Sequence, residues 1–162
     1  MGDLSPSFSR HEFEVDGTSM PEECVAAYTS LCLNILEPMR EHVGQPFIIT
    51  SGYRDAPDNA KDHGVADSQH VASATWCAAD FKIEGMDDLR NLFDWTRLKS
   101  GLVIDQEILE HGLAGHDIIH VSWVTNGARL DALEGDTANR EPYTRFPFNN
   151  PDQAQDQQWP LA

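Results

Sequence analysis

The sequence is poor in basic side chains. Of its 162 residues, 11 are Lys or Arg and 27 are Asp or Glu, so the formal net charge is −16 at pH 7. Such a chain repels the phosphates of nucleic acids and the surface of an anionic membrane, and we expect neither as a partner. The acidic excess is typical of a very soluble protein, of one that binds cations, or of one from a saline habitat.

Cysteine is scarce, and long apolar runs are missing. The three cysteines, Cys24, Cys32 and Cys77, are an odd number without the spacing of a disulfide framework, which predicts reduced and buried thiols. No apolar run is long enough to span a membrane. Residues 1–14 lack the apolar core of a signal peptide, so we expect no leader.

The apolar pattern predicts an α+β fold in which helices pack on a central antiparallel sheet. A first helix is expected over residues 21–44, kinked at Pro38 and ended by Gly44. A second helix is expected over residues 86–99, and the polar segment 54–69 predicts a long loop. Strands are expected over residues 46–53, 77–83, 102–109 and 118–124.

The chain changes character near its end. From residue 136 onward, prolines alternate with Asn, Gln and Asp without a period, which predicts one domain over residues 1–135 and an extended tail over residues 136–162. Aromatic residues in this tail would let it fold back as a strap on its own domain, which is the simpler interpretation. The alternative is an arm that docks onto a larger assembly.

Two histidines and one aspartate occur at places from which they could meet. His70 ends the polar segment, Asp80 lies within the strand predicted over 77–83, and His120 lies within the strand predicted over 118–124. Strands hold side chains in fixed directions, so the three groups could converge on one point. Two imidazoles and a carboxylate form a zinc ligand set that leaves a fourth position for water.

Short motifs around these residues follow one another in a distinctive order: ITSGYR, SQH, AADF and IIHVSW. This order resembles the zinc D-Ala-D-Ala carboxypeptidase family, which includes bacterial wall dipeptidases and phage murein endopeptidases. The first twenty residues form a lead-in to the first predicted helix. This lead-in and the helix also resemble the short phage-type members, so the resemblance runs from about Leu4 to Trp123. It implies an α+β fold with a central antiparallel sheet, as in the Hedgehog signalling domain, over the domain 1–135.

The resemblance implies a role for each motif. The zinc ligands would be His70, Asp80 and His120. Arg54 would hold a carboxylate or carbonyl of the substrate, with Ser51 and Tyr53 of the same motif beside it. A guanidinium suits this task because it is planar, always charged and able to donate two parallel hydrogen bonds.

A catalytic acid is also implied, and two residues are candidates for moving a proton from the zinc-bound water to the leaving amine. Asp117 stands three residues before His120, where several family members place an acid, and it is slightly preferred. Residues three apart on a strand face opposite sides, so Asp117 qualifies only if it precedes the strand or lies on a bulge. Glu110 ends the motif DQEILE, which resembles a phage-type pattern. His116 is a further candidate for stabilising an oxyanion.

The spacing of the first two ligands departs from the family pattern. The family usually has His-x6-Asp with a glycine three residues after the histidine, whereas nine residues separate His70 from Asp80 and Ser73 replaces the glycine. The longer connection, which includes Trp76, could bulge outwards and leave both ligands in place, or it could pull His70 away. In the second case His63 is the substitute ligand.

These features predict a zinc peptidase that cuts peptides of bacterial peptidoglycan. A phage would encode it and either release it at lysis or build it into the virion, where residues 136–162 would contact tail proteins. The alternative is a virion component that retains the peptidase fold without activity. A calcium-binding domain is a third interpretation, which depends on the acidic cluster Asp55, Asp58, Asp62 and Asp67.

Overall fold

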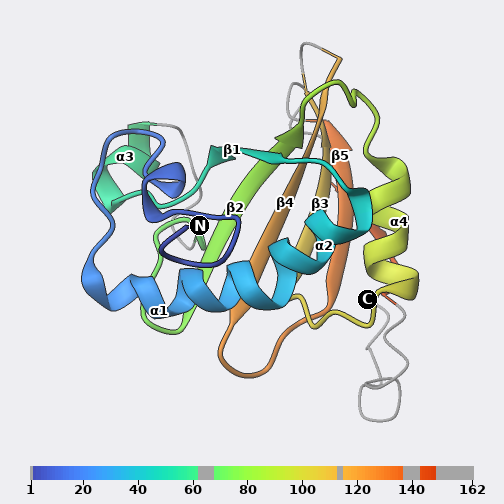
Figure 1. Ribbon diagram of the computed structural model, residues 1–162. Coiled ribbons are helices and arrows are strands. Elements are labelled where there is room, and N and C mark those ends of the chain that lie inside the picture. Colours follow the sequence, from blue (N-terminus) through green and yellow to red (C-terminus); the bar gives the residue numbers. More distant parts are fainter. Residues whose placement is uncertain (1, 62–67, 113–114, 137–142, 149–162) are drawn as a thin grey trace.

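The protein is built on one mixed, six-stranded sheet (Figure 1). The computed structural model describes residues 2–61, 68–112, 115–136 and 143–148. The strands run in the order β1-β2-β4-β3-β5-β6. Their bounds are β1 Phe47–Ser51, β2 Trp76–Ile83, β3 Gln106–His111, β4 Asp117–Val124, β5 Asp131–Asp136 and β6 Thr144–Phe146. Neighbouring strands are antiparallel except for the parallel pair β3 and β5.

The helices are η1 Arg10–Phe13, a 3-10 helix, then α1 Glu22–Leu31, α2 Glu37–Val43, α3 Ala56–Lys61 and α4 Arg90–Lys99, with the π-helical turn η2 Cys32–Leu36 between α1 and α2. Helices α1, α2 and α4 lie on one face of this sheet, which confirms the predicted α+β class (Figure 1). No helix within the described ranges is both long and apolar enough to cross a membrane.

The helix predicted over residues 21–44 is confirmed, together with its irregularity. Proline cannot donate the hydrogen bond that a continuing helix needs. Pro38 therefore lies in the first turn of α2, just after the π-helical turn. Gly44 ends α2 with a φ of 71°, a left-handed conformation that glycine adopts without strain.

Two helix predictions were wrong in part. The segment predicted as a loop contains α3, whose sequence APDNAK has no large apolar side chain and so lacks the apolar stripe that identifies a helix. The side chain of Asp55 caps it, because its Oδ1 accepts a hydrogen bond from the Asp58 backbone at 2.8 Å. The helix predicted from residue 86 begins only at Arg90, since the Asp88 side chain accepts a hydrogen bond from the Arg90 backbone at 2.8 Å.

The strands β5 and β6 were not predicted. Both are short, and the sequence of β5, DALEGD, has no alternation of apolar and polar residues. Residues 144–146 of the predicted tail form β6 against β5, so this part of the tail lies along its own domain, as the strap interpretation expects. Residues 149–162 lie outside the described part of the chain.

Strand register decides which residues face the helices. In β2, Cys77, Ala79 and Phe81 are fully buried beneath them. Their partners in β4 include Val121 and Ile119, which are equally buried. Successive side chains on a strand point to opposite faces, so Asp80 in β2 projects from the face that the helices leave uncovered.

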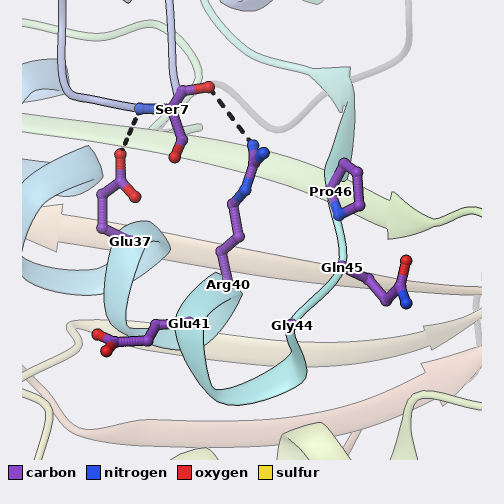
Figure 2. Close-up of a pocket in the computed structure, with 7 residues that line it drawn as sticks. All are labelled: Ser7, Glu37, Arg40, Glu41, Gly44, Gln45 and Pro46. Atoms are coloured by element: carbon purple, nitrogen blue, oxygen red, sulfur yellow. Dashed lines mark hydrogen bonds between the residues drawn. The ribbon is translucent and has the colours of Figure 1, made fainter. Parts of the chain in front are cut away.

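The lead-in is fastened to α2 at a polar recess (Figure 2). Glu37 accepts hydrogen bonds from the Ser7 backbone at 2.6 Å and from the Ser5 hydroxyl at 2.7 Å. Arg40 donates to the Ser7 carbonyl oxygen at 3.4 Å and lies over the Phe8 ring. These groups bind one another, and the recess therefore serves the docking of the lead-in.

One carboxyl group lies among apolar residues on the covered face. Glu107 in β3 is fully buried, and neither of its carboxyl oxygens has a hydrogen-bond partner among the described residues. Burial raises the pKa of this carboxyl well above its ordinary value, and this effect outweighs the opposing influence of Thr96 and Arg97. Folding therefore favours the protonated form of Glu107.

Replacing this group should change how stability depends on pH. In the unfolded chain Glu107 ionises above about pH 4.5, whereas in the folded chain it stays protonated to higher pH. The free energy of unfolding therefore falls as the pH rises above about 4.5. We expect Glu107→Gln to have a higher free energy of unfolding than the wild type near pH 7, and this difference should shrink as the pH falls towards about 4. Urea unfolding across this range measures it.

The exposed Glu84 provides the matched control, because Glu84→Gln makes the same chemical change at the surface. This control should leave the pH dependence of the wild type unaltered. A stability difference for Glu107→Gln that is the same at every pH would contradict the interpretation.

Candidate active site

The residues predicted as metal ligands meet on the uncovered face of the sheet. Asp80 and His120 are direct partners in the register of β2 and β4, and His70 reaches them from the turn before β2. One donor atom from each of the three lies within 4.8 Å of the others. Asp80 Oδ1 is 2.7 Å from His120 Nδ1 and 3.2 Å from His70 Nε2.

The long connection between His70 and Asp80 bulges away from this cluster. Its backbone turns back on itself, with Ser73 donating to the Trp76 carbonyl oxygen at 3.0 Å. The Trp76 indole, which is 42% exposed, donates to the Val71 carbonyl oxygen at 3.1 Å. Of the two outcomes considered for the longer spacing, the structure has the one that keeps His70 at the cluster.

A backbone carbonyl sets the orientation of the His70 ring. Its Nδ1 lies 2.7 Å from the Gly52 carbonyl oxygen, which can only accept a hydrogen bond, so we assign the ring proton to Nδ1. The lone pair of Nε2 then faces Asp80, as the lone pair of a metal-binding imidazole must. The backbone NH of Arg54 donates to the His70 carbonyl oxygen at 3.0 Å and holds the turn in place.

Gly52 is at this position because two parts of the chain cross there. A Cβ atom at residue 52 would lie 2.4 Å from the Phe13 carbonyl oxygen and 2.7 Å from its Cα, which no side chain tolerates. The neighbouring Tyr53 backbone NH donates to the same Phe13 oxygen at 2.8 Å. Next to the crossing, the register of β1 shifts between Ile49 and Ser51, a type of irregularity often found beside active sites.

The electrostatics of the cluster favour a bound cation. Burial works to raise the pKa of Asp80, but the two imidazoles outweigh it and hold that pKa well below its usual range. Burial works to lower the pKa of His70, but the Asp80 carboxylate and the Gly52 carbonyl raise it overall. An ionised carboxylate thus lies between two nitrogen donors.

The residues predicted to bind substrate lie next to His70. The Arg54 guanidinium donates to the Ser51 hydroxyl at 2.6 Å, and its Nε is 4.0 Å from Asp16. The Ser51 hydroxyl is in turn 3.4 Å from His70 Nδ1. The ring of Tyr53 packs into the hydrophobic core, so a contact between Tyr53 and substrate stays a prediction.

The structure does not meet the geometric condition that was set for Asp117 as the catalytic acid. Asp117 could reach the cluster only if it lay on a bulge or before the strand. Instead, β4 begins at Asp117 and keeps a regular register against β3. Asp117 therefore lies on the opposite face from His120. There it accepts a hydrogen bond from the Leu89 backbone at 2.9 Å and lies 2.7 Å from His111 Nδ1.

Glu110 lies on the same face as the cluster. Its neighbour on that face of β3, Ile108, is the direct partner of His120. Burial and the charge of Asp80 raise the pKa of Glu110, although the two histidines and a hydrogen bond from Tyr143 act against them. A raised pKa makes the Glu110 carboxylate a stronger base, which suits it to accept a proton.

The remaining predicted residues have other environments. His116 is exposed and lies 2.5 Å from Asp87, in the connection between β3 and β4, so its suggested role at an oxyanion is not supported. Asp58 pairs with Lys61 at 2.7 Å and accepts a hydrogen bond from Thr18. His63, Asp62 and Asp67 lie outside the described residues.

Asp105 is a supporting residue that the sequence interpretation missed. It is buried, and its Oδ2 accepts hydrogen bonds from Gln69 at 3.0 Å and from Arg129 at 2.6 Å. Ser122, two residues after His120, donates to the same oxygen at 3.4 Å. Asp105 thus connects the turn that carries His70 to the strand that carries His120. Its place at the head of DQEILE was the available signal.

Comparison with known proteins agrees with this arrangement. A family model described as Peptidase M15 matches residues 6–116, which is more than half of the chain and includes His70, Asp80 and Glu110. A search of curated proteins finds no match. The extent of the family match shows that the chain belongs to the peptidase M15 family, a family of metallopeptidases.

Proposed function

We propose that this chain is a zinc-dependent peptidase that hydrolyses peptide bonds of bacterial peptidoglycan. The observation that carries the proposal is the convergence of His70, Asp80 and His120, with Glu110 on the same face of the sheet. Membership of the M15 family supports a hydrolytic role for this cluster.

The donor set fits zinc. Two imidazole nitrogens and one carboxylate oxygen are the combination found in catalytic zinc sites, which keep a further position open for water. His70 contributes Nε2 and His120 contributes Nδ1, the atoms that face Asp80. When bound, the zinc ion would lower the pKa of a water ligand and polarise the carbonyl to be cleaved.

Glu110 would act as the general base and then as the general acid. Its carboxylate would accept a proton from the attacking water and return it to the nitrogen of the leaving amine. Burial and the charge of Asp80 raise its pKa, which makes the uptake of that proton more favourable. Asp117 has no access to this face and instead supports the start of α4.

Arg54 would orient the substrate. Peptide stems of the bacterial wall carry carboxylates, and a guanidinium binds a carboxylate through two parallel hydrogen bonds. Its present partner, the Ser51 hydroxyl, lies next to His70 Nδ1, so a group held by Arg54 would lie close to the cluster.

The inactive alternative rested on the long connection between His70 and Asp80. Since that connection bulges outwards and leaves the cluster assembled, no observation favours this alternative. Phage origin, release at lysis and contact with virion tail proteins through residues 136–162 are parts of the proposal that rest on the sequence resemblance alone.

Metal content tests the cluster directly. We expect protein purified without chelator to carry about one zinc ion per chain and His70→Ala to carry almost none, because two donors bind zinc far more weakly than three. Elemental analysis of the purified chains measures this. His11→Ala, a matched change at an exposed histidine, should retain the metal. A wild-type chain without zinc, or full occupancy of His70→Ala, would contradict the proposal.

A pair of isosteric substitutions tests which acid moves the proton. We expect Glu110→Gln to reduce kcat/KM by about 10²–10⁴-fold, the usual contribution of a general acid–base. Asp117→Asn should reduce it by less than about tenfold, because an amide oxygen can still accept the Leu89 hydrogen bond. The measurement is the release of new amino termini from purified cell wall, with zinc content checked for both variants. Equal losses would assign the role elsewhere.

A further inference from the structure

A tyrosine from outside the family match reaches the proposed acid. The match ends at residue 116, and Tyr143 lies just before β6. Its hydroxyl donates a hydrogen bond to Glu110 Oε1 at 2.8 Å. Two segments that are far apart in the sequence therefore meet beside the histidine cluster.

A glycine makes room for this contact. Gly135 in β5 is the direct partner of Glu110 in β3. A Cβ atom at residue 135 would lie 2.3 Å from Tyr143 Cδ1 and 2.6 Å from Cε1. The tyrosine ring thus lies directly over the backbone of Gly135, and any larger residue there would displace it.

The segment that carries Tyr143 is fixed to the domain. The Phe146 ring packs edge-to-face against Phe93 of α4, with 5.8 Å between the ring centres. Arg97 donates to the Pro147 carbonyl oxygen at 3.0 Å. β6 itself pairs with β5. The position of the Tyr143 hydroxyl is therefore a property of the fold.

We propose that Tyr143 is a positioning residue for Glu110, which it holds in place for proton transfer during peptide hydrolysis. This inference rests on the proposed function, since it assigns Glu110 the role of acid and base. The hydrogen bond fixes one carboxylate oxygen and leaves the other for the transfer. Gly135 is part of the same arrangement, because its missing side chain leaves the space in which the Tyr143 ring lies.

The hydroxyl is suited to remain a donor. Burial, together with the charge of Glu110, raises the pKa of the Tyr143 phenol above its ordinary value. The group therefore stays protonated wherever the enzyme would work, and its proton stays available to Glu110.

The test removes the hydroxyl and little else. We expect Tyr143→Phe to lower kcat by about tenfold with KM within about twofold, because misplacing an acid affects the chemical step more than substrate binding. Melting temperature and zinc content should equal those of the wild type. A change in KM alone, or a loss of zinc or stability that accounts for the lower rate, would overturn the proposal.

A double substitution separates positioning from a general structural effect. In a chain that already carries Glu110→Gln, adding Tyr143→Phe should cause no further loss of kcat, because the group to be positioned is gone. Equal losses in both backgrounds would show that Tyr143 acts independently of Glu110 and would overturn the proposal.

Two further variants examine the surroundings. Gly135→Ala should lower kcat as Tyr143→Phe does, and it should have no further effect in a Tyr143→Ala chain, where no ring needs the space. Arg145→Gln is the matched control on β6, because it breaks the 2.8 Å ion pair with Asp131 away from Glu110. It should leave kcat unchanged, and a loss equal to that of Tyr143→Phe would overturn the proposal.

A measurement without substrate distinguishes failure of this inference from failure of the proposed function. The ultraviolet absorbance of phenolate follows tyrosine ionisation at alkaline pH. Glu110→Gln should lower the pH at which Tyr143 ionises, because the neighbouring negative charge is removed. A wild-type chain without peptidase activity would refute the proposed function. The absorbance would still test the contact between Tyr143 and Glu110, and a titration that Glu110→Gln leaves unchanged would overturn that contact.

Discussion

One carboxylate shared by two imidazoles governs the arrangement of the site. Asp80 and His120 face each other because β2 and β4 pair in that register, and a shift of one residue would turn the side chain on the shifted strand towards the helices. The register is fixed in turn by the apolar residues that alternate with them, such as Ala79, Phe81 and Val121. The apolar residues buried on one face of the sheet thus determine which side chains meet on the other face.

The sequence was informative where chemistry and periodicity coincide. β1, β2 and β4 alternate or carry β-branched residues, and the motifs that contain Asp80 and His120 lie within β2 and β4. The motif that contains His70 lies in the turn before β2. Their convergence was predictable as a possibility, and the family resemblance gave each residue a role. The outward bulge of the connection after His70 was not predictable, since it depends on contacts of Trp76 that have no sequence pattern.

Other features could not have been predicted for definite physical reasons. The choice between Asp117 and Glu110 depends on the residue at which β4 begins, and strand ends are set by tertiary pairing rather than by local preference. The pairing of β5 with β3 has the same origin, because DALEGD carries no strand pattern of its own. Tyr143 is 33 positions from Glu110, so only the folded chain brings the two together.

The crossing at Gly52 makes the first residues of the chain part of the site. The Gly52 carbonyl orients His70, and the Phe13 carbonyl occupies the space that a side chain at residue 52 would need. Phe13 is held there by a core that also includes Phe8 and Leu4. The lead-in contributes no donor atom to the cluster, yet it acts as a brace behind one. A chain whose lead-in detached from the core would retain all three ligands, but the ring of His70 would no longer be held in its orientation.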